Sequence, residues 1–254
     1  LQAPLAARAL GFVARVGREW GVPRRGHTEQ LDEGMPAGVL LLIMAISHER
    51  IEMMQMQNVD VVIVGGGMVG LGLAAALKNS ALTIAIVEGQ LPDTELGEAP
   101  DNRVSALSLA SQRILQGVGA WDGIVARRLQ PYDSMEVWEQ DSFGHIGFDA
   151  ASLRQPALGH IVENRVIQLA LLDTIVGANN ISLLTPARAA SLQSSAAGAL
   201  LLMEDGRALS AKVVVAADGA HSWVRRQADI PLTSWDYGHH ALVATVRSAE
   251  PHEA

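Results

Sequence analysis

Three glycines and one carboxylate have the residue types and the spacing of a dinucleotide-binding site. Gly65, Gly67 and Gly70 form a Gly-x-Gly-x-x-Gly pattern, and Glu88 follows the last glycine by 18 residues. The first glycine permits a tight turn, the second lets a pyrophosphate approach the backbone, and the third lets a helix pack closely on a strand. A carboxylate at position 88 can accept hydrogen bonds from ribose hydroxyls and would repel a 2′-phosphate, which disfavours NADP. The pattern thus predicts a site for the ADP half of FAD or NAD, without choosing between them.

The residues around these glycines predict the strand–helix–strand unit that such a site requires. Residues 59–64 are β-branched and mostly apolar, as in a buried parallel strand, and residues 68–77 have an apolar helical pattern. A second strand is predicted at 82–87, which places Glu88 at its end. The N-terminus of the helix offers free N–H groups and a partial positive charge to a phosphate. The alternative interpretation is an ordinary glycine-rich turn with a solvated glutamate.

A second pattern, Asp-Gly-x-x-Ser-x-x-Arg, begins at Asp218 directly after another apolar strand predicted at 212–217. An aspartate at the end of a strand, followed by glycine, favours a turn into a helix or loop. Ser222 and Arg225 then lie one helical step apart. Taken alone, the pattern is explained by a strand exit and a helix cap, because Asp and Ser commonly cap helices. A functional interpretation arises only when both patterns are considered together.

The rest of the chain predicts short helices and strands separated by turns. Asp205 and Gly206 form a strong hairpin-turn signal. Helices are expected at 105–115 and 164–176, and strands at 135–139, 145–148, 181–184, 189–192, 200–203 and 240–246.

The composition excludes several classes of function. The chain has 254 residues, 49% hydrophobic and 18% charged, which is typical of a globular protein. A net charge of −8 disfavours a nucleic-acid partner, because phosphate binding needs a basic surface. The absence of cysteine excludes disulfides and thiolate metal sites. No metal site is expected from the histidines either, since the adjacent His239 and His240 would point to opposite faces of a strand.

The first part of the chain lacks a strand–turn–helix rhythm. Its longest apolar run, residues 37–46, has ten residues, whereas a membrane-spanning helix needs about 20. The run also lies too far from the N-terminus for a secretory signal. We expect residues 1–53 to be a poorly ordered extension, with a natural start near Met54 or Met56.

Considered together, the two patterns resemble the flavoprotein aromatic hydroxylases (class A monooxygenases). Within that family, the sequence is similar to hydroxylases of bacterial ubiquinone biosynthesis over roughly residues 54–254. The resemblance implies an α/β fold, in which a Rossmann-like FAD-binding domain carries inserted antiparallel β strands of a substrate domain. The segments that carry the similarity are 61–70, 103–106, 135–138, 141–146, 159–164 and 229–246.

The resemblance also implies roles for individual residues, although it indicates no catalytic side chain. One of them, Arg103, has a surface ion pair with the acidic loop before it as its alternative explanation. The implied FAD contacts are Gly65, Gly67, Gly70 and Glu88 on the ADP half, Arg103 near the phosphate and ribose, and Asp218, which also serves the nicotinamide donor.

The implied domain plan alternates between two domains. Residues 54–134 and 158–231 would bind FAD, residues 135–157 would form a substrate-domain hairpin, and residues 232–254 would begin the substrate-domain sheet. The family carries a further Gly-Asp motif downstream, and no such segment follows Val246. The chain is therefore expected to be a truncated N-terminal portion of a longer enzyme, inactive by itself.

The reaction implied by the resemblance is hydroxylation of an aromatic ring. NAD(P)H reduces FAD, the reduced flavin reacts with dioxygen, and a flavin C4a-hydroperoxide transfers one oxygen atom to a polyprenylated phenol. The apolar tail implies a cytoplasmic enzyme at the surface of the inner membrane, beside other proteins of ubiquinone biosynthesis. Two alternatives stay open, namely an NAD-dependent dehydrogenase with the same nucleotide site and a catalytically silent fragment.

Overall fold

The computed structural model describes residues 56–247 and 249 of the chain. The expected extension at 1–53 and the apolar run at 37–46 lie outside the described residues, as do residues 250–254. Among the residues that are described, no helix has the length and apolar character needed to cross a membrane.

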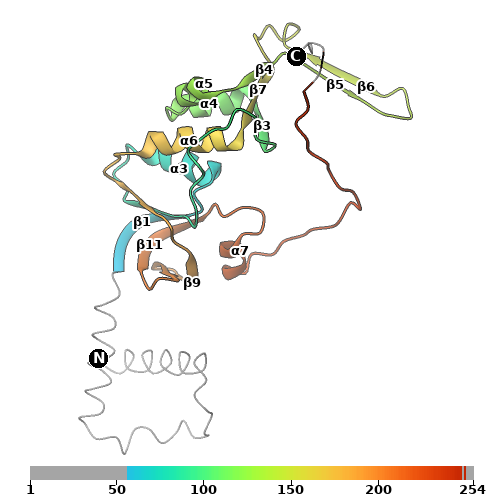
Figure 1. Cartoon of the computed structure of the whole chain (residues 1–254). Helices are drawn as coiled ribbons and strands as arrows, with labels where there is room; N and C mark the ends of the chain where they lie inside the picture. Colours follow the sequence, from blue (N-terminus) through green and yellow to red (C-terminus); the bar gives the residue numbers. More distant parts are fainter. Residues whose placement is uncertain (1–55, 248, 250–254) are drawn as a thin grey trace, which may run out of the picture. The chain divides into compact units, whose positions relative to one another are not determined.

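A six-stranded mixed sheet is the largest sheet of the described residues, in the order β8-β2-β1-β11-β10-β9 (Figure 1). The first four strands are parallel, and β11, β10 and β9 continue the sheet as antiparallel neighbours. The strands are β1 (Met56–Val64), β2 (Ile84–Val87), β8 (Ile181–Leu184), β9 (Ala189–Ser195), β10 (Gly198–Met203) and β11 (Ala208–Ala216).

Strand β1 is apolar on both sides because both faces of the sheet are covered. On one face, α3 (Met68–Leu77) and α6 (Asn164–Ile175) lie side by side (Figure 1). The core on this face includes the fully buried side chains of Ile63, Leu71 and Val166. A second apolar cluster on the opposite face is built from Val59, Val62, Val64, Ala85, Val87, Ala187, Leu201, Met203, Leu209, Ala211 and Val224.

Two smaller sheets accompany the central one. A three-stranded antiparallel sheet has the order β3-β7-β4, and a two-stranded hairpin pairs β5 with β6. These strands are β3 (Val104–Ser108), β4 (Gln130–Tyr132), β5 (Ser134–Trp138), β6 (His145–Asp149) and β7 (Gly159–Glu163). The remaining helices are α4 (Leu109–Gly117), α5 (Trp121–Arg127) and α7 (Trp223–Gln227).

The helix expected at 105–115 is wrong in its first turn. Residues Val104–Ser108 form β3, paired antiparallel with β7, and the helix begins only at Leu109. Ser108 marks the change, because its hydroxyl accepts a hydrogen bond from the Ser111 N–H and caps the helix. The partner strand comes from residues 159–163, more than fifty positions away, so no local pattern reveals this pairing.

The strand expected at 240–246 is also absent, since these residues have no regular secondary structure. A strand needs a neighbouring backbone to satisfy its N–H and C=O groups, and no described strand pairs with this segment. The apolar pattern alone therefore does not produce a strand here. The division into substrate-domain segments at 135–157 and 232–254 stays a prediction.

The predicted strand–helix–strand unit is confirmed, and so is the α/β fold class. Strand β1, helix α3 and strand β2 follow one another as expected, and β1 pairs with β2 in parallel. The second strand is shorter than predicted, starting at Ile84, whereas β11 starts at Ala208, earlier than the predicted 212.

Candidate nucleotide-binding site

A cavity of about 720 Å³ opens where the four parallel strands end. In sheets of this kind, ligands bind outside the carboxyl ends of the strands. The loops after β1, β2, β8 and β11 converge on this place, together with Glu204 from the turn after β10. The lining residues are Val64, Gly65, Gly67, Val87, Glu88, Gly89, Gln90, Ala187, Arg188, Ala189, Glu204, Ala217, Asp218, Gly219, His221 and Trp223.

Close contacts between backbone segments leave no room for a side chain at Gly65 or Gly70. Gly65 has a φ of +109°, and a Cβ built on it would lie 2.3 Å from the carbonyl oxygen of Ala217. A Cβ on Gly70 would lie 2.0 Å from the carbonyl oxygen of Gly65. Since backbone atoms cannot move aside cheaply, neither position accepts a side chain. These two glycines therefore shape the loop, and Gly70 does so while buried in α3.

Gly67 differs from its neighbours because it faces open space. A Cβ built on it would meet no heavy atom within 4 Å, and its φ of −77° is accessible to any residue. Gly67 is the N-cap of α3, which has no side-chain cap and no acidic residue in its first turn. An uncapped helix N-terminus beside a glycine without neighbours fits a pyrophosphate, the group that the Gly-x-Gly-x-x-Gly pattern predicts here.

The Glu88 carboxylate lies next to the glycine loop. One oxygen accepts a hydrogen bond from the Gly66 N–H at 2.5 Å, and the other accepts from the Gln90 N–H at 2.8 Å. The side chain is half-buried and lines the cavity. Each carboxylate oxygen keeps further acceptor capacity, so ribose hydroxyls in the cavity could donate to Glu88 while it holds the loop. Its role as a ribose ligand stays a prediction.

Asp218 lines the same cavity, but its carboxylate is hydrogen-bonded to residues at the start of α7. One carboxylate oxygen accepts from the Ser222 hydroxyl at 2.5 Å, and the other accepts from the N–H groups of Trp223 and Val224 at 2.6 and 3.0 Å. Burial favours a higher pKa for Asp218, yet these hydrogen bonds outweigh it and lower the pKa below its ordinary value. The helix-cap interpretation is thus what the structure shows, and a contact of Asp218 with FAD stays a prediction.

Arg103 is not among the residues that line the cavity. Its side chain is exposed, and its carbonyl accepts a hydrogen bond from the Asn164 N–H at 2.9 Å. Within the described residues, its guanidinium forms no ion pair with the acidic loop before it, where Asp101 pairs with Arg165 at 3.0 Å instead. The structure therefore supports neither interpretation of Arg103 directly.

A buried carboxylate, that of Glu163, fixes the loop that directly precedes Arg103. Glu163 is 4% exposed and forms an ion pair with Arg128, whose Nη2 lies 3.0 Å from Oε2. The same oxygen accepts from the Asp101 N–H at 2.8 Å, and Arg128 also donates to the carbonyl of Gly97 at 2.8 Å. This network connects the loop between β2 and β3 to the start of α6.

Two residues near the site, Gln168 and Arg188, were not predicted from the sequence. Gln168, on α6, donates a 2.6 Å hydrogen bond to the carbonyl of Gly66. A glutamine between the buried Ile167 and Leu169 was a signal that could have been used, since a polar side chain in such a helix needs a partner. Arg188 lines the cavity from the loop after β8, and no motif in the sequence singles it out.

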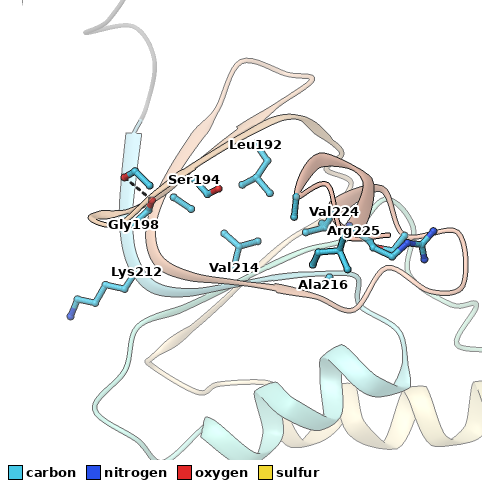
Figure 2. A pocket seen from close by; sticks show the side chains of 13 residues that line it. Leu192, Ser194, Gly198, Lys212, Val214, Ala216, Val224 and Arg225 are labelled. Atoms are coloured by element: carbon cyan, nitrogen blue, oxygen red, sulfur yellow. Dashed lines mark hydrogen bonds between the residues drawn. The ribbon is translucent and has the colours of Figure 1, made fainter. Parts of the chain in front are cut away.

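A second cavity of about 470 Å³ lies between β9, β10, β11 and α7 (Figure 2). Leu192 and Val214 face it, and Lys212 extends away from it toward Asp60, with which it pairs at 2.6 Å. None of the six predicted FAD contacts lines this space. It lacks a glycine loop at a helix N-terminus, so its features do not match a nucleotide site.

Comparisons with known proteins agree with this assignment. The chain matches the FAD binding domain family over residues 58–252. It is 36% identical over 192 residues to the 3-demethoxyubiquinol 3-hydroxylase of Escherichia coli strain K12, covering 75% of this chain and 49% of that protein. It is 35% identical over 193 residues to the ubiquinone hydroxylase UbiL of Rhodospirillum rubrum, covering 76% and 44%.

The fold is shared with a solved structure. PqsL of Pseudomonas aeruginosa, described as a probable FAD-dependent monooxygenase, superimposes with a TM-score of 0.58 at 24% identity, covering 71% of this chain and 48% of that one. The chain spans about half the length of the curated relatives that it matches. With the family match covering most of its length, the chain belongs to the family of FAD binding domains.

Proposed function

We propose that this chain is part of an FAD-dependent monooxygenase that hydroxylates the aromatic ring of a polyprenylated phenol in ubiquinone biosynthesis. NAD(P)H is the proposed electron donor and O₂ the proposed oxidant. The observation that carries the proposal is the convergence of Gly67, the N-terminus of α3 and the Glu88 carboxylate on one cavity at the carboxyl ends of the parallel strands.

The residues of the cavity fit FAD in a simple way. Gly67 and the uncapped first turn of α3 would bind the pyrophosphate, and Glu88 would accept hydrogen bonds from the adenosine ribose. Gly65 and Gly70 would keep the loop in the shape that permits this approach. When bound, FAD would supply the redox chemistry, taking up a hydride from NAD(P)H and activating O₂ for transfer of one oxygen atom.

The substrate class is proposed from the relatives. Two similar proteins carry the names 3-demethoxyubiquinol 3-hydroxylase and ubiquinone hydroxylase. We propose, as the resemblance implies, that the substrate of this chain is a phenol ring with a long apolar tail, namely 2-octaprenylphenol. The tail would bring the enzyme to the surface of the inner membrane, near other proteins that carry ubiquinone precursors.

The first experiment is a flavin-binding measurement on the purified 254-residue chain. We expect a yellow complex with flavin absorbance after addition of FAD, and quenching of flavin fluorescence on titration. Binding of NAD without binding of FAD would instead support the alternative of an NAD-dependent dehydrogenase. A chain that binds neither nucleotide would contradict the proposed function.

The second experiment measures turnover. The FAD complex is mixed with NADH or NADPH, O₂ and a short-chain prenylphenol, and the product is analysed by mass spectrometry for one added oxygen atom. Formation of this product would support the full proposal. Tight FAD binding without NAD(P)H oxidation would support the alternative that the chain by itself is a silent FAD-binding fragment.

A further inference from the structure

Three neighbouring strands of the sheet are followed by residues of different chemical type that line the cavity. Strand β1 ends in the glycine loop, β2 ends at Glu88, and the loop after β8 carries Arg188. Their order in the sheet is β8, β2, β1, and adjacent strands lie about 4.8 Å apart. A nucleotide with its pyrophosphate at β1 and its ribose at β2 therefore extends its base toward the end of β8.

The backbone around Arg188 is fixed next to Glu88. The N–H of Ala187 donates to the carbonyl of Glu88 at 2.8 Å, and the carbonyl of Arg188 accepts from the N–H of Glu204 at 2.9 Å. Ala187 itself is buried, with 6% of its surface exposed. Hydrogen bonds to two other segments, the end of β2 and the turn after β10, thus fix the backbone from which the Arg188 side chain extends.

The Arg188 side chain then runs along Gly89. A Cβ built on Gly89 would lie 3.6 Å from the Nε and 3.7 Å from the Cγ of Arg188. The arginine is exposed, and within the described residues its guanidinium forms no hydrogen bond and no ion pair, although Glu88 and Glu204 line the same cavity. It is the one residue with a permanent positive charge among those that line the cavity.

We propose that the guanidinium of Arg188 stacks on the adenine ring of the bound dinucleotide. A guanidinium is planar and weakly hydrated, and it stacks on aromatic faces in a way that a lysine ammonium does not. The contact adds a base-recognition element to a site whose other features recognise phosphate and ribose. It would favour ligands that carry adenosine, such as FAD, over FMN. This inference rests on the proposed FAD site.

The test compares three ligands on the full 254-residue chain. Dissociation constants for FAD, ADP and FMN are measured for the wild type, Arg188→Ala, Arg188→Lys and the control Arg154→Ala, whose arginine is exposed and does not line the cavity. We expect Arg188→Ala to raise the Kd for FAD and ADP about fivefold and to leave FMN unchanged. Arg188→Lys should recover little of this loss, and Arg154→Ala should behave as the wild type.

Several outcomes would overturn the inference. An unchanged Kd for FAD and ADP in Arg188→Ala would exclude the stacking contact, provided that circular dichroism shows a folded variant. Full recovery in Arg188→Lys, with an effect that vanishes at high salt, would assign Arg188 to charge attraction of the pyrophosphate instead. A wild type that binds ADP but not FAD would contradict the proposed function while leaving the adenine contact testable on ADP. A wild type that binds neither would overturn both.

Discussion

The side-chain amide of Gln168 donates a 2.6 Å hydrogen bond to the carbonyl of Gly66, in the middle of the glycine loop. The N–H of the same glycine donates to the Glu88 carboxylate at 2.5 Å. Gln168 on α6 and Glu88 at the end of β2 thus bind the carbonyl and the N–H of the same residue, Gly66. The shape of the loop depends on these two distant side chains as well as on its glycines.

Replacing Gln168 by glutamate tests this arrangement with almost no change in volume. A carboxylate cannot donate to the Gly66 carbonyl and would lie against its oxygen, so we expect a loss of about 1–3 kcal/mol in the free energy of unfolding. FAD affinity should fall as well, since the loop loses one support. Urea denaturation and a flavin titration measure the two effects. Gln116→Glu, on the exposed side of α4, is the matched control, and an equal effect of both substitutions would contradict the expectation.

The two glycines within α3 should respond in opposite directions to alanine. In Gly70→Ala the new Cβ would meet the Gly65 carbonyl oxygen at 2.0 Å, and we expect a destabilisation of about 3 kcal/mol. In Gly72→Ala the Cβ meets nothing within 4 Å, and alanine should stabilise the helix by about 0.5–1 kcal/mol. Thermal unfolding of both variants checks this. Equal melting temperatures would show that the close contact at Gly70 relaxes without cost.

Gly67→Ala should separate folding from ligand binding. Its Cβ has no protein neighbour within 4 Å, so the free energy of unfolding should change by no more than about 1 kcal/mol. The same methyl group would occupy the space through which a pyrophosphate approaches the backbone. We therefore expect the Kd for FAD to rise about tenfold, which corresponds to about 1.4 kcal/mol. A variant that folds and binds FAD as the wild type does would place the pyrophosphate elsewhere.

Glu88→Gln should weaken FAD binding through the ribose contact. The amide keeps one acceptor for the Gly66 N–H, loses the acceptor for the Gln90 N–H, and lacks the charge that strengthens hydrogen bonds from hydroxyl groups. We expect about a tenfold higher Kd for FAD. Glu95→Gln provides the control, because Glu95 is exposed and does not line the cavity. If ribose contacts are responsible, riboflavin and FMN should bind both variants equally.

The ion pair of Glu163 with Arg128 predicts a pH dependence of stability. Burial of Glu163 favours a higher pKa, but hydrogen bonds from Arg128 and the Asp101 N–H outweigh it and hold the pKa below its ordinary value of 4.5. A carboxylate with a lowered native pKa stabilises the fold fully above pH 4.5, and this stability is lost as the pH falls through the native pKa.

The measurement is a series of urea unfolding curves at pH values from neutral to well below 4.5, for the wild type and Glu163→Gln. The variant should be less stable at neutral pH by about 1.5–3 kcal/mol, because a charge-assisted hydrogen bond is lost. The difference between the two proteins should shrink as the pH falls. A difference that is independent of pH would show that the ionised form of Glu163 is not what stabilises the loop.

Several features of this protein follow from neighbouring residues alone. The β-branched run that ends at Val64, the glycine pattern and the carboxylate at Glu88 all lie within one strand–helix–strand unit. Their types and spacing can be recognised from local patterns, namely side-chain periodicity and the freedom of glycine to adopt a φ of +109°. For this reason the unit and the position of Glu88 beside the loop were predictable from the sequence.

Other features depended on contacts between distant segments. Strand β3 exists because β7 pairs with it, and the segment 240–246 forms no strand because no described strand pairs with it. Gln168 and Arg188 reach the nucleotide site from α6 and from the loop after β8. The local sequence does not name the partners of these residues, even where a polar residue such as Gln168 interrupts an apolar helix face, because those contacts form only when distant segments pack together. The sequence by itself determined the nucleotide-binding unit, and tertiary structure decided which other side chains surround it.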